Sequence, residues 1–491
     1  MAQTNIQIEE ETVQSGDRWI WGIYIALCLL SVVESYAALS QVVGKQGLYI
    51  PLLKHCGLLG FGFLILWVTQ RLHYTKFIFF IKVFAVLVLI SVVSVQWVGS
   101  TINGAQRVIQ LPGFTLQPAE LAKLAIATII PLIVSRNQIS NGVTMKGAII
   151  AVTVVCAYAA FLLGQGLTNT LLLMFTSVVI MWVGGIKVRQ LVMVFAVYLV
   201  FGMGYYMIMK NNQNKQRRAE IEQLASSGAD VSELQAIDDD DANPGRSSTW
   251  TNRIERWKTN HDSLVYMPKT AKNEQEMYAH MAQAHGGICG VGPGNSRECS
   301  RLPLAFSDYI YSIIVEETGL IGGLFVMILY LWLLIRAGLI ASRCARAFPA
   351  LLIMGMAVMI TFQALVHMAI NTGLFPVSGQ SLPLISEGGT SVLVVSAAFG
   401  IMLSVSRHAS QNTIDKMKKK DLENLPKEEQ APNYNRENET SSILKTKRAK
   451  TLFFSLPFFS QKKTAFLSNV WRIGKNLNDI KTLIKDLLKG F

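Results

Sequence analysis

Ten stretches of roughly 20 mainly apolar residues run through this chain, and they constrain its fold more than any other feature. A helix needs about 20 apolar residues to cross the hydrocarbon core of a bilayer, so each stretch predicts a membrane helix. Their expected bounds are 19–39, 51–69, 77–98, 119–135, 147–163, 168–185, 190–209, 308–335, 349–370 and 391–406. The sequence therefore predicts an all-α integral membrane protein with about ten transmembrane helices.

Charged residues avoid these stretches. Only 20 of the 77 charged residues lie within 19–209 and 307–406, although these ranges hold 291 of the 491 residues. Soluble domains carry about 25% charged residues, and this chain has 16%. A soluble enzyme, a fibrous protein and a disordered protein are all excluded. The first 18 residues are polar and acidic, so the first apolar stretch predicts a membrane helix rather than a cleavable signal peptide.

Basic residues in the short loops predict the sidedness of the helices, because cytoplasmic loops carry an excess of Lys and Arg. Alternate loops hold one set, namely Arg71, Lys76, Arg136, Lys146, Lys187, Arg189, Arg336, Arg343 and Arg346. The other short loops hold only Lys45 and Arg107. We therefore expect both termini in the cytoplasm and one long extracytoplasmic loop between the seventh and eighth helices.

This topology divides the chain into five parts. They are an N-terminal cytoplasmic tail (1–18), helices one to seven (19–209), the long loop (210–306), helices eight to ten (307–406) and a basic cytoplasmic tail (407–491). Within the loop, an acidic insertion near 225–248 is predicted to be flexible because it has almost nothing apolar to bury. Its four consecutive aspartates are typical of a solvated charge run more than of a metal site.

The basic tail supplies +9 of the net charge of +13. Nucleic acid is not the expected partner, because a basic segment that leaves a membrane on its cytoplasmic side meets anionic lipid. Near 466–491, apolar residues recur at alternating spacings of four and three. This pattern predicts an amphipathic helix on the inner leaflet, and a coiled-coil partner is the alternative.

A first polar group lies around the fourth predicted helix and includes Arg107, Glu120 and Lys123. Charged residues inside membrane helices are costly and by default mark functional sites. Pro118 suits the first turn of a helix. Glu120 and Lys123 are three residues apart, so they share one helical face and can partly neutralise each other. A structural ion pair and a substrate site both remain open interpretations.

A second polar group joins the long loop to the eighth predicted helix. Five glycines within Gly286–Ser296 allow backbone amides to approach an anionic ligand closely. Asp308 follows at the expected membrane boundary, where partial desolvation can tune the pKa of a carboxylate for proton transfer. Asp308 is also expected to cap the eighth helix, and the two roles can coexist. Cys289 and Cys299 can pair in an oxidising compartment or remain free thiols.

A third polar group, Asn371–Ser391, lies between the ninth and tenth predicted helices and is rich in proline and glycine. These residues break a helix, and irregular backbone at membrane depth is tolerated only when it is buried in protein or lines a cavity. A plain outer loop is the alternative. Together the three groups predict a polar cavity that opens on the outer face.

The same three groups resemble the signature blocks of the SEDS family, which comprises FtsW, RodA and SpoVE. The blocks read LQPAELAKL, then GGICGVGPGNS with LPLAFSDYIYSIIVEETGLIGG, then NTGLFPVSGQSLPLISEGGTS. The resemblance covers roughly residues 20–406. It implies a peptidoglycan glycosyltransferase that joins lipid II units into glycan strands at the outer face of the cytoplasmic membrane. The GPGNS and SDYIY motifs are more similar to those of the division branch of the family than to those of the elongation branch.

The resemblance also implies roles for individual residues. Asp308 matches the family's essential aspartate and is the expected general base, which deprotonates the acceptor sugar hydroxyl. The implied substrate-binding residues are Arg107, Glu120, Lys123, Gln275, Gly292, Gly294, Asn295, Ser296, Gln380, Ser386 and Glu387. Arg253 fits a less specific loop position. The sequence requires no cofactor, although Mg²⁺ or Mn²⁺ can bridge Asp308 and a pyrophosphate, and it contains no complete protein metal cage.

The chain departs from the family's pattern in two places. The segment Gln165–Thr170 lacks the acidic residue of the family's QPDLGT motif. Glu387 replaces an aromatic residue of the family's ISYGG motif, and we expect it to line the cavity, because an ionised carboxylate facing acyl chains is expensive.

The resemblance implies lipid II as substrate, a class B penicillin-binding transpeptidase and other membrane proteins of the division machinery as partners, and the bacterial inner membrane at the division site as location. Two other functions fit a polytopic membrane protein. A flippase for lipid II needs a cavity that opens to both sides of the membrane, and tolerates loss of Asp308 better than a polymerase does. A division scaffold depends on the 407–491 tail rather than on Asp308.

Overall fold

The computed structural model describes residues 16–42, 49–102, 105–111, 114–139, 142–226, 253–254, 257, 273–302, 306–386 and 388–424. Each of the ten predicted stretches forms a helix. The ten helices are α2 (Arg18–Val42), α3 (Tyr49–Arg71), α4 (Tyr74–Val98), α5 (Pro118–Arg136), α6 (Met145–Leu162), α7 (Leu167–Val183), α8 (Val188–Ser226), α12 (Ile310–Arg343), α13 (Ala347–Asn371) and α14 (Gly389–Asn424). Glu387, the tail beyond residue 424 and nearly all of the acidic insertion lie outside the described residues.

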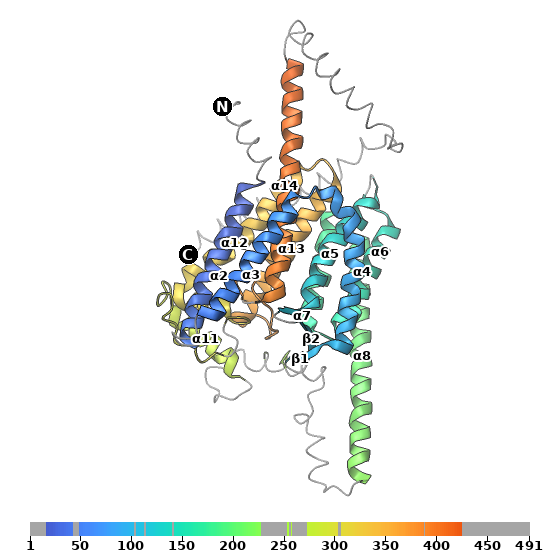
Figure 1. Cartoon of the computed structure of the whole chain (residues 1–491). Coiled ribbons are helices and arrows are strands. Elements are labelled where there is room, and N and C mark those ends of the chain that lie inside the picture. Colours follow the sequence, from blue (N-terminus) through green and yellow to red (C-terminus); the bar gives the residue numbers. More distant parts are fainter. Residues whose placement is uncertain are drawn as a thin grey trace, which may run out of the picture.

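In the described part of the chain, nine of these helices are long and apolar enough to cross a membrane, and α7 is shorter at 17 residues. The molecule is therefore a multi-pass helical membrane protein, as predicted. Two helices continue as polar rods beyond their apolar segments, α8 to Ser226 and α14 to Asn424, and they leave the bundle at opposite ends (Figure 1). The predicted loop thus begins with a helix, because the residues after Met209 are mostly good helix formers.

Two apolar cores hold the bundle together. One is formed mainly by residues of α2, α3, α12, α13 and α14, and the other mainly by residues of α4, α5, α6, α7 and α8. Helices α4, α5 and α13 contribute to both cores. Helices α5 and α13 pack closely, since a Cβ on Gly355 would lie 2.9 Å from the carbonyl oxygen of Ala127. The outer helices expose large apolar side chains such as Phe79 and Val200, as expected of surfaces that face lipid.

A small antiparallel sheet joins α4 to α5 and was not predicted. It consists of β1 (Ser100–Ile102), β2 (Ala105–Leu111) and β3 (Phe114–Leu116), in the order β1-β2-β3. Ser100 pairs with Val108 and Thr101 pairs with Gln106, so Arg107 is the extra residue of a β-bulge. Because bulges redirect side chains, this irregularity determines where Arg107 points. A second hairpin, β4 (Gln138–Ile139) and β5 (Gly142–Val143), joins α5 to α6.

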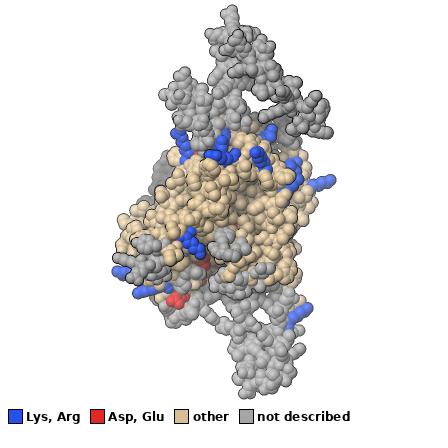
Figure 2. Space-filling model, in the orientation of Figure 1, with Lys and Arg blue, Asp and Glu red and all other residues tan. Residues whose placement is uncertain are grey.

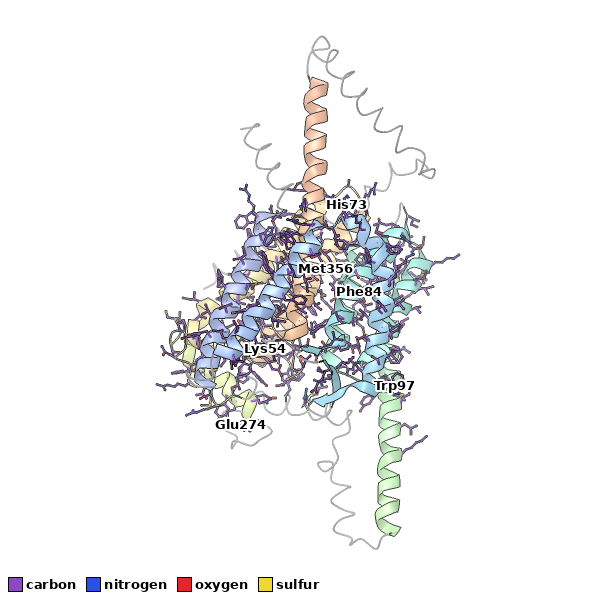
Figure 3. All side chains as sticks on the ribbon, in the orientation of Figure 1. Lys54, His73, Phe84, Trp97, Glu274 and Met356 are labelled. Atoms are coloured by element: carbon purple, nitrogen blue, oxygen red, sulfur yellow. The ribbon has the colours of Figure 1, made fainter. Side chains whose placement is uncertain are left out.

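The two ends of the bundle differ in charge. Many of the described Lys and Arg residues gather across the upper end in Figure 2. His73, in the turn between α3 and α4, lies at this end, whereas Lys54, Trp97 and Glu274 lie near the lower end (Figure 3). The last of these begins α11 (Glu274–Gly286), a helix of the long loop that packs against α12 and was not predicted. Which end of the bundle faces the cytoplasm stays a prediction. The two sets of short loops on which that prediction rests do lie at opposite ends of the bundle.

Candidate functional site

Asp308 is held in place by backbone contacts on both of its sides. The Asn371 side-chain amide donates to the Asp308 carbonyl oxygen at 3.1 Å, and the Ser386 hydroxyl donates to the Ser307 carbonyl oxygen at 2.9 Å. The Ser307 hydroxyl donates to the Asp308 carboxylate at 3.0 Å. The expectation that Asp308 caps the eighth helix is wrong. Tyr309 is the N-cap residue, no side chain bonds to the cap, and the carboxylate is therefore available for other contacts.

Two arginines from distant parts of the chain face this carboxylate. Arg107 comes from the β2 bulge, and Arg253 comes from the long loop, where its guanidinium donates to the Val377 carbonyl oxygen at 3.1 Å. Burial raises the pKa of Asp308 above its ordinary value, whereas the Ser307 hydrogen bond and the charges of Arg107 and Arg253 lower it. The net pKa is raised, so the carboxylate is a stronger base than it would be in bulk water, and the two guanidinium charges limit that rise.

Gly379 allows these charged groups to approach each other. Its φ of +66° lies in the left-handed region. A Cβ at this position would lie 3.2 Å from Asp308 Oδ2 and 4.0 Å from Arg107 Nη1. A side chain larger than hydrogen would therefore crowd the space between the carboxylate and the guanidinium group.

A polar stripe on α13 positions the loop that carries Gly379. Gln363 Nε2 donates to the Ser381 carbonyl oxygen at 3.1 Å, and His367 Nδ1 donates to the Gln380 carbonyl oxygen at 2.6 Å. Asn371, one turn further along, is the residue that holds the Asp308 backbone. Sequence reasoning missed Gln363 and His367. The sequence pattern that could have identified them is the spacing of four between the polar residues Gln363, His367 and Asn371, which places all three on one face of an otherwise apolar helix.

The second half of the loop after α13 is buried in the protein, whereas Leu374 and Phe375 in its first half are exposed. Leu382, Leu384 and Ile385 are at most 1% exposed, and the Tyr330 hydroxyl donates to the Pro383 carbonyl oxygen at 2.5 Å. Leu384 has a φ of +64°, which is strained for a residue other than glycine. This supports the interpretation that the third polar group helps to form a site.

The predicted ion pair on α5 is present. Lys123 Nζ lies 2.7 Å from Glu120 Oε1, and both side chains are 3% exposed. Lys123 also donates to Gln363 Oε1 at 2.8 Å. The pair therefore connects α5 to the polar stripe of α13. Neither charged residue lines the cavity described next, so their contact favours a positioning role over direct contact with a substrate.

A cavity of about 750 Å³ lies beside this charged cluster, between α7, α8 and α13. Its polar lining residues are Arg107, Thr168, Asn169, Arg253, Ser378 and Gln380. The remainder is mostly apolar and follows α7 from Leu167 to Val178. Phe175 and Phe362 stack across two of its helices at 3.7 Å between ring centres. The arrangement fits a ligand with a long apolar part and an anionic group.

The structure divides the predicted substrate-binding residues into two groups. Arg107 and Gln380 line the cavity, and Gln380 Nε2 donates to Asn169 Oδ1 at 3.0 Å. Ser386 supports the backbone next to Asp308. Its hydroxyl donates to the Ser307 carbonyl oxygen and accepts a hydrogen bond from the Leu382 amide at 2.7 Å. Gln275 lies on α11 and is not among the described cavity residues.

The glycine-rich loop packs against α12 instead of the cavity. The amides of Val291 and Gly292 donate to the carbonyl oxygens of Glu316 and Glu317, near the kink at Gly319. The Ser296 hydroxyl bonds to the Glu316 carboxylate. The other predicted residues of this loop, Gly292, Gly294 and Asn295, are likewise absent from the described cavity lining. No disulfide joins Cys289 and Cys299 in the structure.

The described residues contain no group of three His, Cys, Asp or Glu side chains that could hold a metal ion. Asp308 is a single carboxylate and faces two guanidinium groups, which is a poor donor set for a divalent cation. The residues present therefore do not fit a protein-bound metal, and the chemistry below uses none.

The family model for cell cycle proteins of the FtsW, RodA and SpoVE type matches residues 17–233 and 252–411. The chain belongs to this family. Among curated SEDS relatives, the probable peptidoglycan glycosyltransferase FtsW of Geobacter sulfurreducens is 27% identical over 420 residues, covering 82% of this chain and 98% of the relative. The protein of the same name from Aliivibrio salmonicida is 25% identical over 398 residues, covering 79% and 88%.

Solved structures show the same SEDS fold. One, described as structural coordination of polymerization and crosslinking by a peptidoglycan synthase complex, superimposes with a TM-score of 0.58 at 22% identity, covering 80% of this chain and 98% of that one. The rod shape determining protein RodA of Thermus thermophilus gives a TM-score of 0.53 at 21% identity, covering 80% and 97%.

Proposed function

We propose that this SEDS protein is a peptidoglycan glycosyltransferase that polymerises lipid II into glycan strands during cell division. One observation carries the proposal. A partly buried carboxylate, Asp308, lies beside a large apolar cavity whose polar end holds Arg107 and Arg253. The substrate of such an enzyme combines an apolar polyprenyl chain, a pyrophosphate and a sugar, and the apolar lining and the two arginines match the first two of these parts. The relatives named as probable peptidoglycan glycosyltransferases support the same activity.

In the proposed reaction, Asp308 removes the proton from the acceptor sugar hydroxyl as that oxygen attacks the anomeric carbon of the donor. The new carbon–oxygen bond forms as the bond from the anomeric carbon to the pyrophosphate oxygen breaks. The leaving group departs with the bonding electrons and gains negative charge. Arg107 and Arg253 stabilise that charge, since preorganised cations in a site of low dielectric favour a charged transition state.

The apolar cavity has the shape and position to bind a polyprenyl chain along α7. Its lining residues Leu172, Phe175 and Phe195 belong to helices that face lipid, so a chain can enter from the bilayer without crossing water. Burial of apolar carbon contributes about 0.8 kcal/mol per CH₂ group. This binding energy fixes the donor while the reacting atoms remain near Asp308.

We further propose that the Asp308 end faces outward across the bacterial inner membrane and that the His73 end faces the cytoplasm. The excess of basic residues at the His73 end supports this orientation. A class B penicillin-binding transpeptidase is the proposed partner at the division site, because a structure with the same fold belongs to a peptidoglycan synthase complex. The polar segment of α8 reaches beyond the membrane on the outer side, within reach of such a partner.

The test is formation of glycan strands from purified lipid II by the full chain with its cognate transpeptidase. We expect Asp308→Asn to lower the rate by about 10²–10⁴-fold, the usual contribution of a general base, while lipid II still binds. Glu274→Gln removes an acidic residue of α11 on the same side and should leave the rate unchanged. Equal rates for wild type and Asp308→Asn would remove Asp308 from the chemistry. Transport of lipid II without polymer would favour a flippase, and neither activity would favour a scaffold.

A further inference from the structure

A second pocket lies at the opposite end of the bundle from Asp308. It has a volume of about 230 Å³ and is formed by the turn between α3 and α4, the turn between α12 and α13, and the part of α14 that leaves the apolar bundle. His73, Arg346 and His408 line it, with Tyr74 and Pro349 forming apolar walls. Figure 3 places His73 at the upper end of the molecule.

The side chains lining this pocket that can carry a charge near neutral pH are all basic. Among the described residues that line it, none is an aspartate or a glutamate. Burial lowers the pKa of His73, and the positive charges of His408, Lys76 and Arg346 lower it further. His73, Arg346 and His408 thus gather basic groups at one small pocket. An anion in the pocket would offset their positive charge.

The hydrogen bonds of the two histidines leave one nitrogen of each ring for a ligand. The Thr75 amide donates to His73 Nδ1 at 3.2 Å, so Nε2 of the neutral ring carries the proton. His408 Nδ1 donates to the Ser404 carbonyl oxygen at 2.7 Å, so its Nε2 is the ring nitrogen left for a ligand. The ring centres lie 3.8 Å apart. In the imidazolium form of His408, one N–H group from each of the two adjacent rings can donate to the same anion.

The pocket also joins segments that are far apart in the sequence. The Ser404 hydroxyl donates to the Leu72 carbonyl oxygen at 2.5 Å, and the Arg407 guanidinium donates to the Gln70 carbonyl oxygen at 3.2 Å. Both bonds hold α14 against the end of α3. A ligand that contacts His73, Arg346 and His408 together would add a link from α14 to the beginnings of α4 and α13.

We propose that this pocket binds the phosphate group of an anionic phospholipid from the membrane leaflet at the His73 end. A phosphate offers several acceptor oxygens for Arg346 and the two histidine N–H groups. A lipid fits better than a soluble phosphate because the pocket opens where the bundle leaves the membrane, and apolar Tyr74, Pro349 and Val405 share its wall. The lipid would fix α14 at the point where its polar rod begins. This inference does not depend on the proposed polymerase activity.

The experiment measures thermal unfolding of the full chain in detergent during titration with dioleoylphosphatidylglycerol. Dioleoylphosphatidylcholine tests the need for net negative charge, and inorganic phosphate tests a soluble source. Arg346→Gln should weaken the phosphatidylglycerol midpoint by more than about tenfold, because it removes a hydrogen bond between two charged groups. Arg346→Lys retains the charge and should lose less. Arg136→Gln removes a charge from the same end, outside the pocket, and should weaken the midpoint by no more than the roughly fivefold effect of general surface attraction.

His408→Gln tests the histidine contacts separately. It should weaken the phosphatidylglycerol midpoint by about fivefold, because it removes one hydrogen-bonding group from the phosphate. An equal loss of affinity in Arg136→Gln and Arg346→Gln would reduce the effect to general surface attraction and overturn the proposal. Stabilisation by inorganic phosphate equal to that by phosphatidylglycerol would overturn the lipid assignment. Arg346 is exposed in the structure, so its variants should fold normally.

Discussion

The two pockets at opposite ends of this helical bundle both gather basic side chains, but only the one at the Asp308 end has a carboxylate beside its cations. At the Asp308 end, Arg107 and Arg253 face a partly buried acid beside a cavity of about 750 Å³. At the His73 end, a pocket of about 230 Å³ has arginine and histidine groups and no acidic lining residue among those described. A site that exchanges a proton needs a base as well as anion-binding groups. The first end has both, and the second can only hold an anion.

The ends also differ in how deeply their ion pairs are buried. Glu120 and Lys123 are each 3% exposed near the Asp308 end, whereas Arg336 is 20% exposed in its 2.6 Å contact with Asp17 near the His73 end. Breaking a fully buried pair leaves an uncompensated charge and costs more than breaking a pair that water can reach. The stability of the fold therefore depends more strongly on the Glu120–Lys123 pair than on the Arg336–Asp17 pair.

The largest expected effect is on stability. Lys123→Met should lower the free energy of unfolding by about 3–5 kcal/mol, because Glu120 then remains buried without its cation. Arg336→Met should cost clearly less. Thermal or denaturant unfolding in detergent measures both. The double variant Glu120→Gln with Lys123→Met should recover most of the loss, and failure to recover would mean that packing of the lysine stem, rather than charge, explains the effect.

A smaller effect is expected on catalysis. Arg107→Gln should lower the turnover number for lipid II polymerisation by about 10²-fold, since removing one group that stabilises developing charge has this effect in other enzymes. Arg346→Gln, the same substitution at the other end, should leave turnover within about twofold. Single-turnover rates of strand formation provide the comparison. Equal losses from both variants would show that net charge, and not position, matters.

The smallest expected effect concerns the contact between Gln380 and Asn169. Gln380→Ala removes a 3.0 Å hydrogen bond at the polar end of the cavity. Its net value is about 1 kcal/mol, or roughly a fivefold rise in KM for lipid II with turnover nearly unchanged. Asn169→Ala should have the same effect, and the double variant should add little to either one. Additive losses would indicate that the two side chains act separately.

Much of this architecture follows from the sequence. The ten apolar stretches predict the ten helices because the bilayer fixes their length and composition. Glu120 and Lys123 were expected to pair because their spacing of three places them on one helical face, and the structure contains that pair. Asp308 was found through its motif and its place at a helix boundary.

Other parts of the site depend on contacts that spacing does not encode. Arg107 reaches the cavity through a β-bulge, and Arg253 does so through a bond to Val377, 124 residues away. The glycine-rich loop was expected to bind substrate, but its amides bond to carbonyl oxygens of α12. Short-range patterns cannot reveal which of two surfaces such a loop will contact. The polar stripe of Gln363, His367 and Asn371 was readable in principle, since its period is helical.

The central claim is that ionised Asp308 is the base and that Arg107 adjusts its pKa. The most direct measurement is the pH dependence of kcat/KM for lipid II polymerisation, from about pH 4 to pH 8, in wild type and Arg107→Gln. Activity should fall as pH drops through the Asp308 pKa, which burial raises above its ordinary value of 3.8. Removing the Arg107 charge should raise that pKa further and move the acidic limb to higher pH. An acidic limb at the same pH in both proteins would contradict the account.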